Sequence, residues 1–426
     1  MDERPHVVIL GAGFGGLEAA KTLARAPVRV TIVDKRNHHL FQPLLYQVAT
    51  AALAPTDIAA PVRTILAAQD NVTVRLGRAT AIDAARRRLE LAEGEPLEWD
   101  VLIVAAGLTN AYFGHDAWEV SAPGLKSLEE ALRIRDHVLL AYERAETAGD
   151  EERRRLLTFV VIGGGPTGVE LAGALAEIAR KTMTRNFRHF DPRSARVVLV
   201  EGGDRLLASY PPELSERARA DLEELGVEVR LGARAKDIDA GGVTLEDERV
   251  EACTVLWAAG VGGVPVARTL GVPLDRMGRV PVRPDLRPDG LERVFVIGDL
   301  ASCAGEDGKP LPGVAQVALQ QGRHAARSAL RVLDGEALEA FRYRDLGSMA
   351  TIGRKRAIAV LGRIQLEGLL AWLAWLFVHL MALVGFRNRV AVLAEWAWAY
   401  FTYQRSARVI LDRAAPRTTG RGGAGL

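Results

Sequence analysis

Cysteine is scarce in this sequence, and its scarcity excludes several classes of protein. The 426 residues contain only two cysteines, Cys253 and Cys303, too few for a disulfide-stabilised scaffold or for a zinc or iron–sulfur site with four thiolates. The first residues also lack a basic stretch followed by an apolar one, so no secretory signal is expected. A reducing, cytosolic environment is therefore expected.

The chain as a whole has almost no net charge, but its two parts differ in charge. The formal net charge is +2, yet from Leu346 onward eleven basic residues stand against three acidic ones. This end therefore carries +8, and the preceding 345 residues carry −6. The acidic body gives no sign of nucleic-acid binding, and the basic end favours contact with anionic lipid.

The length and the hydrophobic pattern indicate two α/β domains and an appendage. A chain of 426 residues exceeds the ~250–300 residues that one hydrophobic core supports. Apolar runs alternate with glycine turns and helical segments, and this pattern restarts near Phe159. Such runs predict parallel sheets covered on both faces. The fold class expected is α/β, with two Rossmann-like dinucleotide-binding domains and a C-terminal membrane-associated helical segment.

The first glycine-rich turn has the features of a dinucleotide site. It follows the expected strand His6–Leu10, opens a helix expected over Leu17–Ala26, and contains Gly11, Gly13, Gly15 and Gly16. The G-x-G-x-x-G spacing allows a tight turn, close approach to a pyrophosphate, and helix N–H groups directed at the anion. A second strand, Val28–Val33, ends at Asp34, whose carboxylate suits a ribose hydroxyl. A purely structural glycine turn is the alternative.

A second turn repeats this arrangement after the strand Phe159–Ile162. Its glycines are Gly163, Gly165 and Gly168, and the corresponding acid is Glu201. The acid lies thirty-three residues after the last glycine, because the insertion 181–195 precedes its strand. A carboxylate there favours NADH by repelling a 2′-phosphate, although nearby Arg205 leaves some use of NADPH open.

Two dinucleotide folds in one chain suggest a permanently bound carrier and an arriving reductant. The strand Val294–Ile297 ends in Gly298 and Asp299, and such an acid can return to the first domain and hold a ribityl hydroxyl of FAD. Taken with the first turn, this pair favours FAD in the first domain and NADH in the second. Two further strands end in similar small-residue turns, at Gly107 and Gly260.

With these features, the chain resembles the type II NADH dehydrogenases, among the flavoproteins with two dinucleotide-binding domains. The most specific matching segments are VDKRNHHLFQPLLYQVATAAL (33–53), AQVALQQGRHAA (315–326), GSMATIGRK (347–355) and VGFRNR (384–389). Ala105-Ala106-Gly107 departs slightly from the Ala-Thr-Gly of many relatives. The resemblance implies hydride transfer from NADH to FAD, then two-electron transfer to a membrane quinone, ubiquinone or menaquinone, without proton pumping. It adds Lys35, Ala315 and Gln316 to the cofactor contacts.

Thiol chemistry of related flavoproteins is not expected. Disulfide reductases carry a cysteine pair just after the first ribose acid, and the stretch Asp34–Leu53 has none. Sulfide:quinone oxidoreductases also use cysteines against the flavin, but Cys253 and Cys303 suit small packed hydrophobes better. No metal site is expected.

The quinone-binding site is expected at a helix over Val314–Leu333. Gln316 and Gln320 are four residues apart and share one helix face, and by resemblance they hydrogen-bond quinone carbonyls. Glu170 lies in the first turn of the helix expected over Val169–Arg180, where the helix dipole stabilises its charge. By resemblance Glu170 tunes hydride or charge transfer. Tyr46 fits the flavin or quinone region and a plain core equally well.

The C-terminal region is expected to attach to a membrane surface. Gly368–Phe386 has no formal charge, Arg387 and Arg389 follow it, and a second aromatic helix is expected over Val390–Tyr403. This pattern favours a monotopic anchor on the cytoplasmic face of the cell membrane over a single span or a helix used only for dimerisation. A homodimer is also expected.

The domain extents follow from these motifs, and two other functions remain as alternatives. The alternatives are a soluble NAD(P)H-dependent reductase of a ferredoxin-like acceptor and an NADH-responsive flavoprotein scaffold. The expected extents are FAD-binding residues 1–120 and 271–345, NADH-binding residues 121–270, and a membrane-anchoring or dimerisation region with a disordered tail, residues 346–426.

Overall fold

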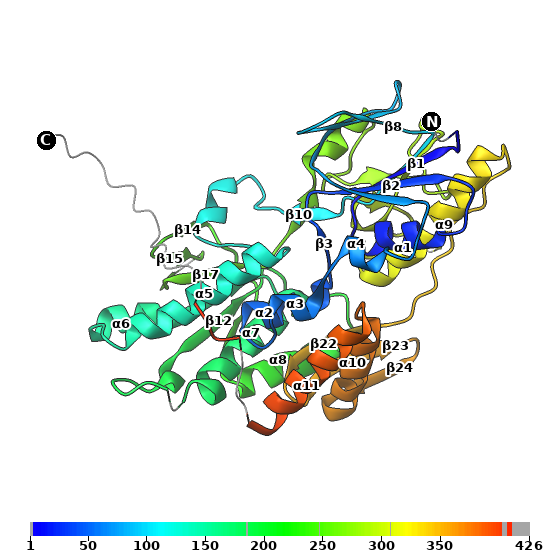
Figure 1. Cartoon of the computed structure of the whole chain (residues 1–426). Coiled ribbons are helices and arrows are strands. Elements are labelled where there is room, and N and C mark those ends of the chain that lie inside the picture. The colour runs from blue at the N-terminus through cyan, green and yellow to red at the C-terminus, as the bar shows by residue number, and fades with distance from the viewer. Residues whose placement is uncertain (1–2, 185, 247, 307, 403–406, 411–426) are drawn as a thin grey trace, which may run out of the picture.

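Two parallel sheets form the centre of the molecule, as the repeated pattern predicts. The computed structural model describes residues 3–184, 186–246, 248–306, 308–402 and 407–410 (Figure 1). The strand order of the first sheet is β20 (Val294–Val296), β9 (Val101–Val104), β1 (His6–Leu10), β2 (Arg29–Asp34) and β5 (Val72–Leu76). The order of the second is β17 (Thr254–Trp257), β11 (Thr158–Ile162), β12 (Arg196–Val200) and β13 (Val227–Arg230).

The two sheets have the same connectivity. In each, the strand before the glycine turn is central, the acid-bearing strand lies on one side, and the strand that ends in a small-residue turn lies on the other. Every residue of β1, β9, β11 and β17 is buried, as expected for parallel strands covered on both faces. The expected duplication is therefore confirmed, and only the first sheet has an additional strand, β20.

Helices cover one face of each of these sheets, and a small antiparallel sheet covers much of the other face. Helix α1 (Phe14–Thr22) follows the first glycine turn and packs against α9 (Ala315–Leu333), so closely that a Cβ on Gly322 would overlap the Gly15 carbonyl oxygen. The second sheet is covered by α5 (Leu128–Ala145), α6 (Asp150–Leu156), α7 (Pro166–Glu177) and α8 (Pro212–Glu224). Helices α1 and α7 each begin three residues earlier than expected, directly at their glycine turns.

Two paired strands connect the two domains. Strand β10 (Leu108–Asn110) carries the chain out of the first domain, and β18 (Val261–Gly263) carries it back. The two strands pair antiparallel, so the second domain is inserted into the first. Each domain also has a small antiparallel sheet, β6 (Ala79–Asp83), β7 (Arg88–Leu91) and β8 (Leu97–Glu98) in the first, and β14 (Asp237–Asp239), β15 (Gly242–Thr244) and β16 (Arg249–Glu251) in the second.

The C-terminal region begins with a sheet, which the sequence analysis did not predict, and the expected helical segment follows it. Strands β22 (Ser348–Gly353), β23 (Arg356–Leu361) and β24 (Ile364–Glu367) form an antiparallel meander. The uncharged run Gly368–Phe386 is then divided between two helices, α10 (Gly368–Ala382) and α11 (Phe386–Thr402). Gly385 adopts a φ of 89° between them, a value that glycine tolerates without steric cost.

Short elements connect the first domain to this C-terminal region. Figure 1 shows α10 and α11, in orange and red, beside α2 and α3 in blue. The Trp396 indole on α11 donates a hydrogen bond of 2.8 Å to the Gln47 side chain on α2. The remaining helices and strands are α2 (Leu45–Ala49), α3 (Pro55–Ile58), α4 (Val62–Ile65), β3 (His38–Leu40), β4 (Ala59–Pro61), β19 (Val280–Pro281) and β21 (Ala301–Ser302).

Candidate active site

In the first glycine turn, Gly11, Gly13 and Gly16 have different surroundings and therefore different structural roles. Gly11 has a φ of +102°, and a Cβ there would overlap the Ala105 carbonyl oxygen. A Cβ on Gly16 would overlap the Gly11 carbonyl oxygen, so only glycine lets α1 start this close to the strand. A Cβ on Gly13 would meet nothing within 4 Å. The turn is therefore sealed behind Gly11 and Gly16 and open at Gly13, the shape that a pyrophosphate requires.

The second turn has the same geometry. Gly163 has a φ of +111° and lies against the backbone of Ala258, and a Cβ on Gly168 would overlap the Gly163 carbonyl oxygen. A Cβ on Gly165, the counterpart of Gly13, again meets nothing within 4 Å. Both turns thus fit a dinucleotide, with the open glycine at the amino end of a helix in each case.

Both acidic residues lie against their glycine turns, despite different spacing along the chain. The Asp34 carboxylate accepts hydrogen bonds from the N–H groups of Ala12 at 2.7 Å and Arg36 at 2.8 Å. The Glu201 carboxylate accepts from Gly164 and Gly203, both at 2.6 Å. Each carboxylate keeps lone pairs for ribose hydroxyls. The long gap before Glu201 is accommodated outside the sheet, since β12 pairs in register with β11.

Gly298 and Asp299, which follow strand β20, lie on the same edge of the first sheet as the first glycine turn. Because β20 pairs with β9 in parallel, Gly298 and Asp299 emerge at the carboxyl edge that also carries Gly11. Gly298 has a φ of +69°, and its N–H donates to the Gln321 side chain at 2.7 Å. The buried amide of Gln321 therefore holds the turn before Asp299. Sequence reasoning missed Gln321, although it follows Gln320 directly.

His39 is a second residue that the sequence analysis did not single out. It is 3% exposed, its Nδ1 lies 2.9 Å from the carbonyl oxygen of Ala12, and its ring contacts Phe14 of the glycine turn edge to face. A carbonyl oxygen can only accept, so Nδ1 carries the proton. Burial lowers the pKa of His39, and within the described residues its Nε2 has no hydrogen-bond partner. His39 thus presents an unoccupied acceptor near the first turn.

The other residues predicted to contact cofactor lie near these turns. Lys35 follows Asp34 and is exposed, while Gly107 and Gly260 precede the paired strands β10 and β18. Gly107 has a φ of +66° and open space at its Cβ position, whereas a Cβ on Gly260 would overlap the ring of Phe113. Ala315 is the first residue of α9.

Glu170 was expected in the first turn of its helix, but α7 begins three residues earlier, at Pro166, and its first turn contains no acidic residue. The stabilisation of its charge expected from the helix dipole is therefore weaker at this position. Burial instead dominates and raises the pKa of Glu170 to about 8, although a hydrogen bond with the backbone of Thr351 opposes this rise. The phenol of Tyr210 lies within the influence of this carboxyl, since burial and the Glu170 charge both raise the Tyr210 pKa. The expected dipole effect is therefore outweighed by desolvation, and the carboxyl is poised to hold a proton near neutral pH.

Gln316 and Gln320 share one face of α9, as predicted, and both bind a neighbouring segment. The Gln316 side chain donates to the Gly347 carbonyl at 2.7 Å and accepts from the Leu346 N–H at 3.0 Å. The Gln320 side chain donates to the Arg344 carbonyl at 2.8 Å and accepts from the Arg344 N–H at 3.0 Å. Each amide keeps one N–H and one lone pair.

The two cysteines show no sign of redox activation. Cys303 is buried and Cys253 is half-buried, and burial raises the pKa of both thiols. A raised pKa disfavours the nucleophilic thiolate. Within the described ranges, no three histidine, cysteine or acidic side chains gather closely enough to hold a metal ion.

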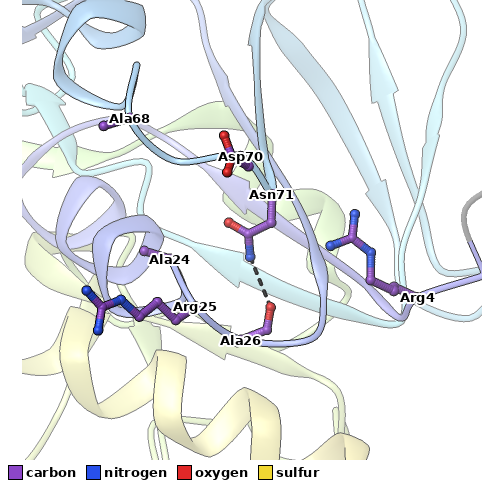
Figure 2. Close-up of a pocket in the computed structure, with 7 residues that line it drawn as sticks. All are labelled: Arg4, Ala24, Arg25, Ala26, Ala68, Asp70 and Asn71. Carbon is purple, nitrogen blue, oxygen red and sulfur yellow. Dashed lines mark hydrogen bonds between the residues drawn. The ribbon is translucent and has the colours of Figure 1, made fainter.

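A hollow of about 610 Å³ lies away from these motifs (Figure 2). Its lining includes Arg4 before β1, Arg25 after α1, and Asn71 before β5. These positions belong to the amino edge of the first sheet, whereas the glycine turns lie at the carboxyl edge. Parallel sheets of this type bind nucleotides at the carboxyl edge, so this hollow is not the cofactor site.

Comparison with known proteins supports the same architecture. Residues 5–322 match the family model described as pyridine nucleotide-disulphide oxidoreductase, and residues 346–404 match the one described as NDH2 C-terminal domain. The chain is 43% identical to type II NADH:quinone oxidoreductase Ndh of Mycobacterium tuberculosis, covering 97% of this chain and 91% of the relative. It is 29% identical to type II NADH:quinone oxidoreductase of Staphylococcus haemolyticus, covering 84% of this chain and 90% of the relative.

Solved structures agree at the level of the fold. NDH2 from Plasmodium falciparum in complex with NADH matches with a TM-score of 0.89 at 18% identity, over 96% of this chain and all of that one. The sulfide:quinone oxidoreductase from Aquifex aeolicus matches with a TM-score of 0.73 at 19% identity, over 93% of this chain and 95% of that one. Together with the paired turns and the C-terminal match, these findings show that the chain belongs to the type II NADH dehydrogenases, within the pyridine nucleotide-disulphide oxidoreductases.

Proposed function

We propose that the protein is an FAD-dependent NADH:quinone oxidoreductase. The observation that carries this proposal is the pair of matching glycine turns, each with an open central glycine and a carboxylate fixed beside it. Two such sites in one chain suit a bound carrier and an arriving reductant. When bound, FAD supplies hydride acceptance from NADH and electron delivery to a quinone, without proton pumping.

The two sites differ in a way that favours FAD in the first. Only the first sheet receives a late strand, β20, which brings Asp299 to the turn of Gly11 and Gly13. The second turn, with Gly163, Gly165 and Glu201, is then the NADH site. The predicted domain extents follow from this assignment, and the antiparallel pair β10–β18 supports a chain that leaves the first domain and returns to it.

Glu170, Gln316 and Gln320 remain the proposed catalytic residues. A carboxyl with a pKa of about 8 can hold or release a proton beside the transferring groups, which supports a role for Glu170. The remaining N–H of each glutamine could donate to a quinone carbonyl without placing a charge in an apolar tunnel. Because their other bonds hold residues 344–347, both glutamines also shape this segment.

The exposed apolar surface of α10 and α11 is proposed to lie on a lipid bilayer. Leu370 and Phe377 on α10 are 68% and 67% exposed, and Phe386 and Phe401 on α11 are 80% and 79% exposed. Soluble monomers seldom expose such apolar surface. Within the described residues, no helix is long and apolar enough to cross a membrane.

Basic side chains beside this surface support attachment to anionic lipid. Arg363, in the turn between β23 and β24, and Arg387, in the first turn of α11, are exposed next to Ile364 and Phe386. Cations attract the negative surface of the cytoplasmic leaflet, so we place the protein on the cytoplasmic face of the cell membrane. A homodimer using part of the same surface belongs to this proposal. The tail predicted to be disordered, residues 414–426, lies outside the described residues.

Steady-state oxidation of NADH by the detergent-solubilised flavoprotein tests the activity. Ubiquinone and menaquinone analogues serve as acceptors, and flavin reduction is followed separately by absorbance. Reduction of either quinone with concurrent loss of NADH is expected. Intact flavin reduction by NADH without quinone reduction would reject the proposal. It would favour the ferredoxin-like reductase if a small iron–sulfur acceptor restored turnover, and the scaffold if none did.

A further inference from the structure

Strand β22 lies along one face of α7, and three residues of that helix meet its backbone. Glu170 forms a hydrogen bond with the backbone of Thr351. Three residues later, a Cβ on Gly173 would overlap the carbonyl oxygen of Ile352. Four residues further, the Glu177 carboxylate accepts from the Arg354 N–H at 2.6 Å. Spacings of three and four place these residues on one helix face, so β22 and α7 have a fixed register.

Gly173 decides how close this contact can be. Gly173 lies inside α7, where glycine forms helix less readily than alanine. Its lack of a side chain lets the Ile352 carbonyl approach the helix directly. Any larger residue would push β22 away from α7, and with it the Thr351 backbone beside Glu170.

The other end and the other face of β22 are also held in place. Just before β22 begins at Ser348, Gly347 and Leu346 are hydrogen-bonded to the Gln316 amide on α9. On the side away from α7, Ala357 and Ala359 of β23 pack against Ala371 of α10. The strand therefore runs from the flavin-domain helix to the NADH-domain helix, one sheet below the exposed apolar surface.

We propose that β22 is the positioning element for Glu170, and that Gly173 and Glu177 set its register. The proposal rests on the function proposed above, because it assigns to this strand the environment of a catalytic carboxyl. Glu170 faces Thr351 from β22 and Tyr210 from the loop before α8, and Tyr210 is the titratable group among these neighbours. Glu177 and the Arg354 backbone hold the end of the strand one to two turns away.

The protonation of Glu170 itself tests this proposal. Infrared difference spectra of the FAD-loaded full chain, recorded from pH 6 to 10, detect the carboxyl C=O stretch of protonated Glu170, assigned by its loss in Glu170→Gln. In Gly173→Ala, water should enter beside the displaced strand. Because burial is the main cause of the raised pKa, the titration midpoint should fall by about one pH unit, a tenfold lower proton affinity.

Two variants of Glu177 test the proposal independently, in case Gly173→Ala does not fold. Glu177→Ala removes the acceptor for the Arg354 N–H and should lower the midpoint in the same direction, whereas Glu177→Gln keeps an acceptor oxygen and should restore it. Gly149→Ala, where a Cβ meets nothing within 4 Å, serves as the matched control and should titrate like the unaltered protein. Unchanged midpoints in both Gly173→Ala and Glu177→Ala, with only lower melting temperatures, would overturn the proposal. This readout is independent of quinone turnover, so failure of the proposed activity is recognised separately.

Discussion

The three spaced glycines of the first turn should respond differently to the same substitution. Gly16→Ala places a methyl group on the Gly11 carbonyl oxygen, so it should lower the free energy of unfolding by about 1–3 kcal/mol even without FAD. Gly13→Ala meets open space and should leave the apoprotein stable while weakening FAD binding, because its methyl group occupies the pyrophosphate approach. Chemical denaturation of the apoprotein and FAD titration measure the two effects. Equal loss of stability in both variants would contradict the assigned roles.

Glu170 should make the stability of the protein depend on pH. Its folded-state pKa of about 8 lies above the ordinary value of 4.5, so between these values the folded protein keeps a proton that the unfolded chain has released. The free energy of unfolding should therefore fall as pH rises through this window and level off above pH 8.

Glu170→Gln removes this dependence, because the amide does not ionise. The melting temperature of the variant should match that of the unaltered protein near pH 4.5 and exceed it increasingly up to about pH 8. Melting curves of both proteins at several pH values measure the difference. A difference that stays constant across this range would show that the carboxyl is not buried in its neutral form.

At the scale of elements, helix α9 is hydrogen-bonded to residues 344–347, just before the C-terminal sheet begins. Gln320→Leu removes both hydrogen bonds to Arg344 and the remaining N–H that is proposed for the quinone. Quinone turnover should fall about tenfold, roughly the 1–1.5 kcal/mol of one neutral hydrogen bond, while reduction of the flavin by NADH keeps its rate. Stopped-flow absorbance separates the two half-reactions. An equal loss in both would assign Gln320 to folding alone.

Helices α10 and α11 should bind lipid through their exposed apolar side chains. Leu370→Ser and Phe377→Ser together remove two large side chains that are mostly exposed, so the melting temperature should stay near that of the unaltered protein. Partitioning onto vesicles of anionic lipid should fall at least tenfold, since each such side chain contributes about 1.5–3 kcal/mol when fully buried. Sedimentation with vesicles measures this loss. The control Val120→Ser, at a site 75% exposed and distant along the chain, should bind as before.

At the scale of the whole molecule, the parts that the sequence predicts are those encoded by local pattern. Gly11, Gly163 and their strands share a spacing that favours a nucleotide-binding turn, and the repeat of this pattern predicts the duplicated sheets. Asp299 could be assigned because it follows a buried strand. The family resemblance supplied the quinone and the membrane, which no local pattern specifies alone.

The missed features depend on contacts between distant segments. The sheet β22–β24 was overlooked because its strands precede a long apolar run, Gly368–Phe386, that dominates the hydropathy of this region. Gln321 and His39 are ordinary in sequence, and only burial against Gly298 and Ala12 marks them. The sequence placed the Glu170 charge under the helix dipole, whereas burial raises the pKa of this carboxyl, and its hydrogen-bond partner Thr351 lies about 180 residues later in the chain.

The insertion of the second domain into the first dictates an order of folding during synthesis. The sheet of the second domain is complete once Trp257 has left the ribosome, whereas the first sheet waits for β20, which ends at Val296. The FAD site proposed here also includes Asp299, and the covering helix α9 ends only at Leu333. Domains fold as units as they emerge, so the half of the protein that begins first becomes competent to capture its cofactor last. Until then, the nascent first domain presents an unfinished sheet edge at β9 for almost two hundred residues of translation.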